Sequence, residues 1–250
     1  MATYVVKISS QLTWNIPAYA SPILKAMRRN RVVVVSGGAV RRGIEAAGLT
    51  MATATTLQMQ AAAGPGQLEL MKEWQACCGD TKIAQFLYTH HLFDDPTNNI
   101  REVIDQALDM GMLPVANGLD TVTNEETRLT AKVSENSGVA SRLAVILEAD
   151  TLVMLGNQPY IYDSSPETNP FAQPIREVID LSDEFLEQFP KEEAQDGSFG
   201  GIRANVESCL YAARRGVKVV VTSGRNHKNL PRILRGEEVT GTVFRPQKAM

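Results

Sequence analysis

The sequence predicts an α/β fold in which a mostly parallel β-sheet is covered by helices. Short apolar runs rich in β-branched residues recur along the chain, as expected for strands buried on both faces. Segments with helical periodicity separate these runs, and such alternation is typical of parallel sheets. The 250 residues show no break in composition, so we expect one large domain.

Six apolar runs have the length expected of buried strands. They are Tyr4–Ile8, Arg31–Val35, Lys82–Leu87, Leu113–Ala116, Thr151–Leu155 and Val217–Val221. The helices predicted between them are Ser21–Asn30, Gln67–Cys78, Asn98–Met110, Gly138–Glu148 and Ile202–Arg215.

Two glycines and two further segments complete the expected elements. Gly111 and Gly216 each precede a strand and are predicted to cap the preceding helices. The segments Asn157–Asp163 and Gln173–Ile179 are expected to form a second, antiparallel part. The acidic stretch Asp180–Asp196 is predicted to be a solvated helix and loop.

Composition and charge argue against several classes of protein. The formal charge of −3 gives no indication of a nucleic-acid surface. The cysteines Cys77, Cys78 and Cys209 lack metal-ligand spacing, and their odd number suggests reduced thiols in the cytoplasm. No apolar run approaches the length of a membrane span, and no export signal is visible.

The first two loops that could carry chemistry follow the first two predicted strands, at the edge where parallel sheets bind ligands. Lys7 ends a strand before Ser9-Ser10 and can reach an anion there, although a plain strand-end lysine is the simpler interpretation. Gly37 and Gly38 open a helix after the second strand and let backbone approach a ligand. A tight turn is the alternative there, since the loop has no Walker A or G-x-G-x-x-G pattern.

The other two loops lie later in the chain. Asn117 and Asp120 follow a buried strand and suit an amino group or hydroxyls, with a surface loop capped by Asx turns as the alternative. The glycine loop Ser198–Gly201 leads to Asn205 and is otherwise a flexible entry to a helix. Histidine catalysis is not expected, because no carboxylate partner for the histidines is evident.

Taken in order, these loops resemble the amino-acid kinase family, and most closely its glutamate 5-kinases. The resemblance covers nearly the whole chain. Its motifs are Val5-Val6-Lys7, Ser36–Val40, Gln58–Gln67, Pro114–Thr123, Tyr162, Pro166, Asn169-Pro170, Gly200-Gly201, Leu234–Glu237 and Gly241–Phe244.

The resemblance implies a three-layer sandwich with a central, mainly parallel sheet, as in the carbamate kinase-like fold. Residues 1–250 would form a single kinase domain without the C-terminal PUA domain of many relatives. Residues 1–150 would bind the amino acid and residues 151–250 the nucleotide.

The chemistry implied by the resemblance is transfer of the γ-phosphate of MgATP to the γ-carboxylate of glutamate, a step of proline biosynthesis. A carboxylate is already a nucleophile at pH 7, so catalysis would depend on alignment and on neutralising phosphate charge. Two lysines would supply much of that charge, and the nucleotide would carry Mg²⁺.

Matching the family motifs position by position assigns roles to sixteen residues. The catalytic positions are Lys7 and Asn205. The substrate-binding positions are Gly37, Gly38, Ala39, Asn117, Asp120 and Asn136. The ATP-binding positions are Ser9, Gly156, Asn157, Tyr162, Gly200, Gly201, Ile202 and Arg203.

Several of these positions depart from the family pattern, mostly on the phosphate side. Asn205 replaces the second lysine, Ser137 replaces the aspartate that organises the lysines, and Gly156-Asn157 replaces a Thr-Asp pair. Arg203 is a poor substitute, because residues two apart on a helix point to roughly opposite sides. Lys132 is another candidate cation.

Two hypotheses therefore stay open. The protein is a divergent kinase for a glutamate-like carboxylate, or it is a pseudokinase that binds an amino acid or an active homologous subunit. We expect a homo-oligomer, with Gln67–Cys78 as a contact helix, and neither nucleic acid nor membrane as a partner. Gly37, where the family has a serine, leaves room for a longer or substituted amino acid.

Overall fold

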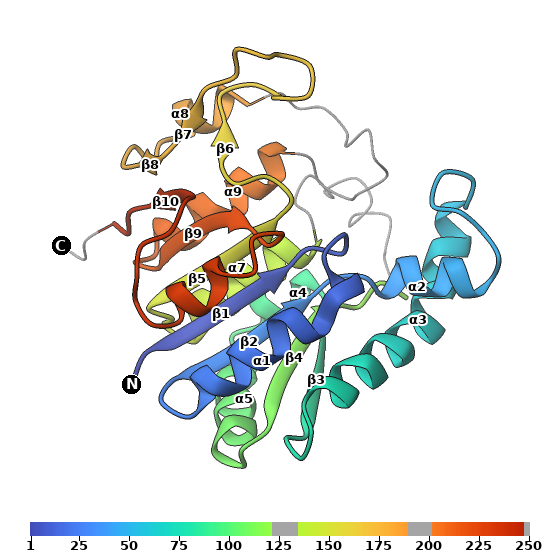
Figure 1. Cartoon of the computed structure of the whole chain (residues 1–250). Helices are drawn as coiled ribbons and strands as arrows, with labels where there is room; N and C mark the ends of the chain where they lie inside the picture. The colour runs from blue at the N-terminus through green and yellow to red at the C-terminus, as the bar shows by residue number, and fades with distance from the viewer. Residues whose placement is uncertain (122–134, 190–201, 248–250) are drawn as a thin grey trace.

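An eight-stranded sheet forms the centre of the protein in the computed structural model, which describes residues 1–121, 135–189 and 202–247 (Figure 1). The strand order is β3-β4-β2-β1-β5-β9-β10-β8. The strands are β1 (Thr3–Ile8), β2 (Arg31–Ser36), β3 (Ile83–Tyr88), β4 (Leu113–Gly118), β5 (Thr151–Gly156), β8 (Glu177–Val178), β9 (Lys218–Ser223) and β10 (Thr242–Phe244). All neighbours pair in parallel except β9 and β10, which confirms the mainly parallel sheet.

Helices cover both faces of the sheet, so the predicted three-layer sandwich is confirmed (Figure 1). Alternate residues of a strand face opposite sides, and Val5 and Val6 accordingly belong to different core clusters. One face packs against α4 (His90–Asp94), α5 (Ile100–Asp109), α7 (Glu135–Ile146), α8 (Asp183–Glu187) and α9 (Ile202–Ala213). The other face packs against α1 (Ile16–Met27), α3 (Thr56–Cys77) and α10 (Asn229–Ile233).

Helix α3 begins at Thr56, eleven residues before the predicted start at Gln67. Thr55 and Gln58 form a capping box that fixes this start. Pro65 lies inside the helix, and Gly66 allows α2 (Ala39–Ala46) to approach closely: a Cβ on Gly66 would overlap the carbonyl oxygen of Ala39. Local sequence suggested a break where tertiary packing favours continuation.

Helix α1 also begins before its predicted start, at Ile16 instead of Ser21. Pro17 occupies the first turn, where a missing N–H costs nothing, and Pro22 is accommodated inside the helix. The predicted glycine caps are confirmed, because Gly111 and Gly216 have φ of 74° and 89°.

The smaller antiparallel part consists of β6 (Ile161–Tyr162) and β7 (Pro174–Ile175), as expected. The prediction was wrong for the end of its second segment, because β8 joins the main sheet beside β10. Within Asp180–Asp196 the structure shows α8, which begins at a Ser182 cap and buries Phe185; residues 190–196 lie outside the described residues.

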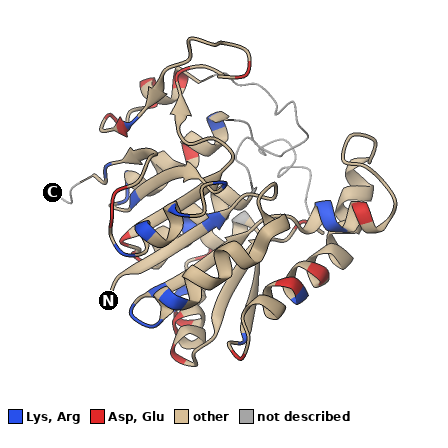
Figure 2. Ribbon diagram, viewed as in Figure 1, with Lys and Arg blue, Asp and Glu red and all other residues tan. Residues whose placement is uncertain are grey.

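A buried hydrogen bond joins elements from opposite ends of the chain. The hydroxyl of Tyr19 on α1 donates to the carbonyl oxygen of Gly224, just after β9, at 3.1 Å. Acidic and basic residues are interspersed over the ribbon, consistent with the small net charge (Figure 2). Among the described residues, none of the helices has both the length and the apolar character needed to span a bilayer.

Candidate functional site

The parallel register brings the ends of three strands together. Lys7 on β1 pairs with Val35 on β2 and with Met154 on β5. The loops that follow are joined by backbone hydrogen bonds, from Gly37 N to Ile8 O at 3.0 Å and from Ser9 N to Leu155 O at 3.1 Å. The predicted residues Lys7, Ser9 and Gly37 therefore lie at one edge of the sheet, where α/β proteins bind ligands.

The Gly37–Gly38 turn is held rigidly by Arg42. Its guanidinium donates to the carbonyl oxygens of Gly38 at 3.2 Å and Thr13 at 2.7 Å. Glu73 on α3 holds the same guanidinium through a 2.5 Å ion pair. Gly38 has φ of 107°, which favours glycine there, and leads into α2 at Ala39. The turn that was assigned to substrate is therefore preorganised.

Lys7 is a mostly buried amine that has no hydrogen-bond or ion-pair partner among the described residues. Burial lowers the pKa of Lys7 from 10.5 to about 8. The Cys209 thiol of α9 lies nearby; burial raises the pKa of Cys209 to about 12, and the Lys7 charge opposes that rise. An unpaired ammonium of this kind is suited to a bound anion.

The amino-acid side of the site centres on the end of β4. Gly118 N donates to both Asn117 Oδ1 and Asn136 Oδ1, each at 3.0 Å. The Nδ2 group of Asn117 donates to Gln67 Oε1 on α3 at 2.6 Å. Asn117 and Asn136, predicted separately, are thus brought together around one backbone amide. Asp120 follows two residues after Gly118 and lines the adjoining cavity.

The nucleotide side lies at the ends of β5 and β9. Gly224 N donates to Gly156 O at 2.9 Å, and the Ser223 hydroxyl donates to Asn157 O at 3.0 Å. Arg225 Nε donates to Asn157 Oδ1 at 3.4 Å. The predicted residues Gly156 and Asn157 therefore lie beside an exposed cation that the sequence analysis missed.

Ser137 and Asn205 occupy the positions where the resemblance places an aspartate and a lysine. The hydroxyl of Ser137 on α7 donates to Asn205 Oδ1 on α9 at 2.7 Å, and Ser137 is fully buried. The two helices are therefore joined here by a neutral hydrogen bond.

The remaining predicted ATP-binding residues are spread around α9. Arg203 donates to the carbonyl oxygens of Leu186 and Phe189 at 2.9 and 2.8 Å, so its guanidinium lies against the end of α8. Ile202 is exposed at the start of α9. Tyr162 lies in β6, where it pairs with Pro174. Gly200, Gly201 and Lys132 lie outside the described residues.

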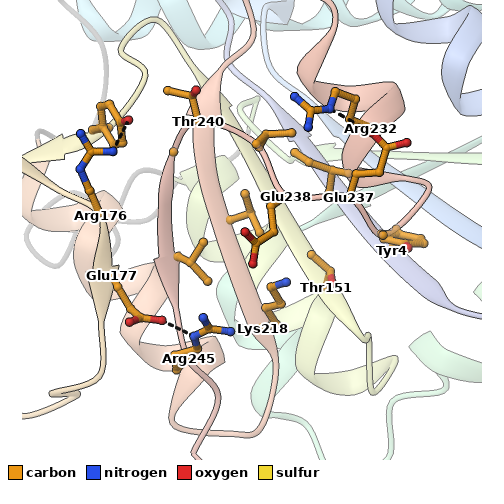
Figure 3. A pocket seen from close by; sticks show the side chains of 17 residues that line it. Tyr4, Thr151, Arg176, Glu177, Lys218, Arg232, Glu237, Glu238, Thr240 and Arg245 are labelled. Atoms are coloured by element: carbon orange, nitrogen blue, oxygen red, sulfur yellow. Dashed lines mark hydrogen bonds and ion pairs between the residues drawn. The ribbon is translucent and has the colours of Figure 1, made fainter.

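Two cavities lie at opposite ends of the sheet strands. A cavity of about 260 Å³ lies at the end of β4 and is lined by Gln67, Leu68 and Asp120 among others. A larger one, about 520 Å³, lies at the opposite end of the sheet, beside the first residues of β1, β5 and β9 (Figure 3). Its charges are largely paired, as in Arg232–Glu237 and Arg245–Glu177. We therefore place the candidate site at the smaller cavity and the edge beside it.

The described residues contain no group of three or more His, Cys, Asp and Glu side chains arranged to hold a metal ion. The expectation that Mg²⁺ arrives with the nucleotide stays a prediction. The anion-accepting features present, Lys7 and the Gly37–Gly38 turn, are compatible with phosphate oxygens.

Three residues of the site were missed. Gln67 stood inside a recognised motif but was expected to begin a helix, and Arg42 gave no signal beyond its place in a glycine turn. Arg225 follows a strand and glycine, in a pattern equivalent to the loops that were noticed. Strand-end position was therefore a usable signal for Arg225 only.

Comparison with known proteins identifies the family to which the chain is similar. The model of the amino acid kinase family matches residues 2–223. Glutamate 5-kinase from Pseudomonas putida strain F1 is 32% identical over 223 residues, covering 88% of this chain and 58% of that protein. Glutamate 5-kinase from Gloeobacter violaceus is 34% identical over 227 residues, covering 88% and 60%. The chain thus spans less than two thirds of the length of these curated relatives.

Two solved structures share the fold at low sequence identity. An isopentenyl phosphate kinase structure has a TM-score of 0.64 at 15% identity and covers 97% of this chain and 99% of that one. UMP kinase from Ureaplasma parvum has a TM-score of 0.62 at 13% identity, with 98% of each chain covered.

Proposed function

Because the chain belongs to the amino acid kinase family, we propose that it transfers the γ-phosphate of ATP to the side-chain carboxylate of glutamate or a closely related amino acid. The observation that carries this proposal is the position of Lys7. It lies on β1, between the predicted amino-acid loop at the end of β4 and the predicted nucleotide loop at the end of β5. Residues 1–150 would supply the first loop and residues 151–250 the second.

The reaction needs no general base. A carboxylate oxygen attacks the γ-phosphorus, a new O–P bond forms, and the bond from that phosphorus to the bridging oxygen of ADP breaks. Lys7 would neutralise charge on the transferring group; with a pKa of about 8 it is mostly protonated at pH 7. Mg²⁺, bound to the phosphates, would add further neutralisation. Asn117 and Asn136 would orient the amino acid.

A second candidate function rests on the Ser137–Asn205 hydrogen bond. A neutral pair supplies less charge to a transferring phosphoryl group than a lysine does, and loss of such a contact costs about 10²–10³ in rate. A pseudokinase that binds an amino acid, alone or as the partner of an active homologous subunit, fits that loss.

Two measurements separate the candidates. The first is hydroxamate formation from L-glutamate, MgATP and hydroxylamine, with Lys7→Met as the matched control. The second is calorimetry with MgATP and with L-glutamate separately. Activity that requires Lys7, together with binding of both ligands, supports the kinase. Glutamate binding without nucleotide binding supports the pseudokinase. If neither ligand binds at millimolar concentration, both candidate functions are contradicted.

A further inference from the structure

The side-chain amide of Gln67 has an unpaired polar group in the protein interior. Gln67 is only 8% exposed. Its Oε1 accepts the hydrogen bond from Asn117 Nδ2, but its Nε2 is buried and has no partner among the residues that the structure describes. Buried polar groups are almost always hydrogen-bonded, so an unpaired N–H of this kind indicates a missing acceptor.

A cavity beside Gln67 provides room for that acceptor. The cavity has a volume of about 260 Å³ and lies between α3 and the ends of β3 and β4. Its lining includes the apolar side chains of Leu68, Leu87 and Leu119 together with the carboxylate-bearing residue Asp120. A small ligand that carries both an anionic and a cationic group matches the amide donor and the carboxylate.

The strand order gives the direction in which an amino acid would lie. Strands β1 and β4 are separated by β2, which places their ends about 10 Å apart at the usual interstrand spacing. A glutamate whose side-chain carboxylate lies at Lys7 therefore has its α-carbon towards β4. Gln67, Asn117 and Asp120 are the polar residues at that end.

We propose that Gln67 determines substrate specificity by donating a hydrogen bond from Nε2 to the α-carboxylate of the bound amino acid. The inference rests on the proposed function for the orientation of the ligand. Asn117 positions the amide, since its hydrogen bond to Oε1 turns Nε2 away from itself. Asp120 lies where it can receive the α-ammonium group. The ligand class is thus an α-amino acid with a second carboxylate.

The test compares two ligands that differ in the α-carboxylate. L-glutamate carries this group, and 4-aminobutyrate lacks it but retains the amine and the other carboxylate. Gln67→Glu keeps an oxygen for Asn117 and removes the N–H donors. We expect its Kd for L-glutamate to rise about tenfold or more, while its Kd for 4-aminobutyrate changes less than about threefold. The matched control is Gln106→Glu, the same change at an exposed position on α5 that does not line the cavity, and it should leave both values unchanged.

Binding is measured by calorimetry without nucleotide, so failure of phosphoryl transfer alone does not affect the result. Equal L-glutamate affinity in Gln67→Glu and wild type overturns the inference, as does absence of L-glutamate binding by the wild type. If the variant does not fold, the side-chain amide signals of ¹⁵N-glutamine-labelled wild type decide. At least one must shift with L-glutamate and stay unmoved with 4-aminobutyrate, and the absence of any such response also overturns the inference.

Discussion

The hydroxyl of Ser137 donates to Asn205 Oδ1 at 2.7 Å, which joins α7 to α9 across 68 positions of sequence. The family resemblance places an acid and a lysine at these two positions. In this chain the two positions carry a neutral, hydrogen-bonded pair. A charge introduced at only one of these two positions would face a neutral partner. The two positions therefore have to be changed together.

Restoring both charges should increase phosphoryl transfer. In Ser137→Asp/Asn205→Lys, the carboxylate would orient the new ammonium and offset its burial, so we expect hydroxamate formation to rise by about 10²-fold. Each single variant should give a smaller gain and lower stability, because its charge would be unpaired. The measurement is the initial rate at saturating MgATP and L-glutamate.

A matched control adds the same charge elsewhere. Asn226 is exposed in the turn after β9, so Asn226→Lys should leave the rate unchanged. An equal gain from Asn226→Lys would attribute the effect to net charge. A double variant no faster than wild type, although correctly folded, would show that more than this pair separates the chain from an efficient kinase.

Lys7 should reduce stability at neutral pH. Burial lowers the pKa of Lys7 from 10.5 to about 8. Below pH 8 the folded protein therefore contains a buried ammonium, which lowers the free energy of unfolding. Between pH 8 and 10.5 the unfolded chain binds more protons, and the free energy of unfolding attributable to Lys7 rises with pH. Lys7→Met should therefore be more stable than wild type by about 1–3 kcal/mol at pH 7, and this advantage should disappear towards pH 10.5.

Urea denaturation of both proteins between pH 7 and pH 10 measures this difference, and other titrating groups cancel in the comparison. A difference independent of pH would mean that Lys7 is solvated. The same protonation predicts that affinity for anionic ligands falls as pH rises through about 8 in wild type but not in Lys7→Met.

Two glycines of α3, separated only by Pro65, should respond oppositely to alanine. A Cβ on Gly66 would overlap the backbone of α2 at Ala39, so Gly66→Ala should destabilise the protein by about 1–3 kcal/mol. A Cβ on Gly64 would meet Thr121 Cγ2 at an ordinary 3.8 Å, so Gly64→Ala should be neutral or stabilising by up to about 1 kcal/mol. Denaturation midpoints measure both, and equal effects would contradict the close packing of α2 on α3.

Arg42 should hold the Gly37–Gly38 turn in place. Arg42→Ala removes the hydrogen bonds to Thr13 and Gly38 and the ion pair to Glu73, and we expect a loss of about 1–3 kcal/mol in stability. L-glutamate affinity should fall as well, because the turn would lose its fixed conformation. Arg41→Ala is the matched control, because Arg41 forms no ion pair with any residue that the structure describes. Calorimetry and denaturation together test this, and similar losses in both variants would argue against a specific role.

The sheet was largely predictable because its central strands are buried on both faces. Each of the six apolar runs became a strand whose ends differ by one or two residues, as for Leu113–Ala116 within Leu113–Gly118. The short strands β8 and β10 carry no such signal, since two or three residues do not establish a periodicity. Helix α3 was mispredicted at its start because Gly66 reads locally as a break, whereas its role is to admit α2.

The loops of the site could be predicted from their places at strand ends, but their contacts could not. Asn117 and Gln67 are 50 positions apart, and no local rule pairs an amide after a strand with one inside a helix. Ser137 and Asn205 were recognised as departures from a pattern, yet their hydrogen bond depends on how α7 packs against α9. Pairings of this kind belong to tertiary structure.

The buried bond from Tyr19 to Gly224 limits how the molecule can open. Strand β1 is hydrogen-bonded to β2 on one side and to β5 on the other. The two halves therefore share one continuous sheet and cannot separate by a hinge motion. The hydrogen bond from Tyr19 to Gly224 also joins the two halves, on the side of the sheet covered by α1. Entry of reactants and exit of products must then take place while the two halves stay joined through this sheet.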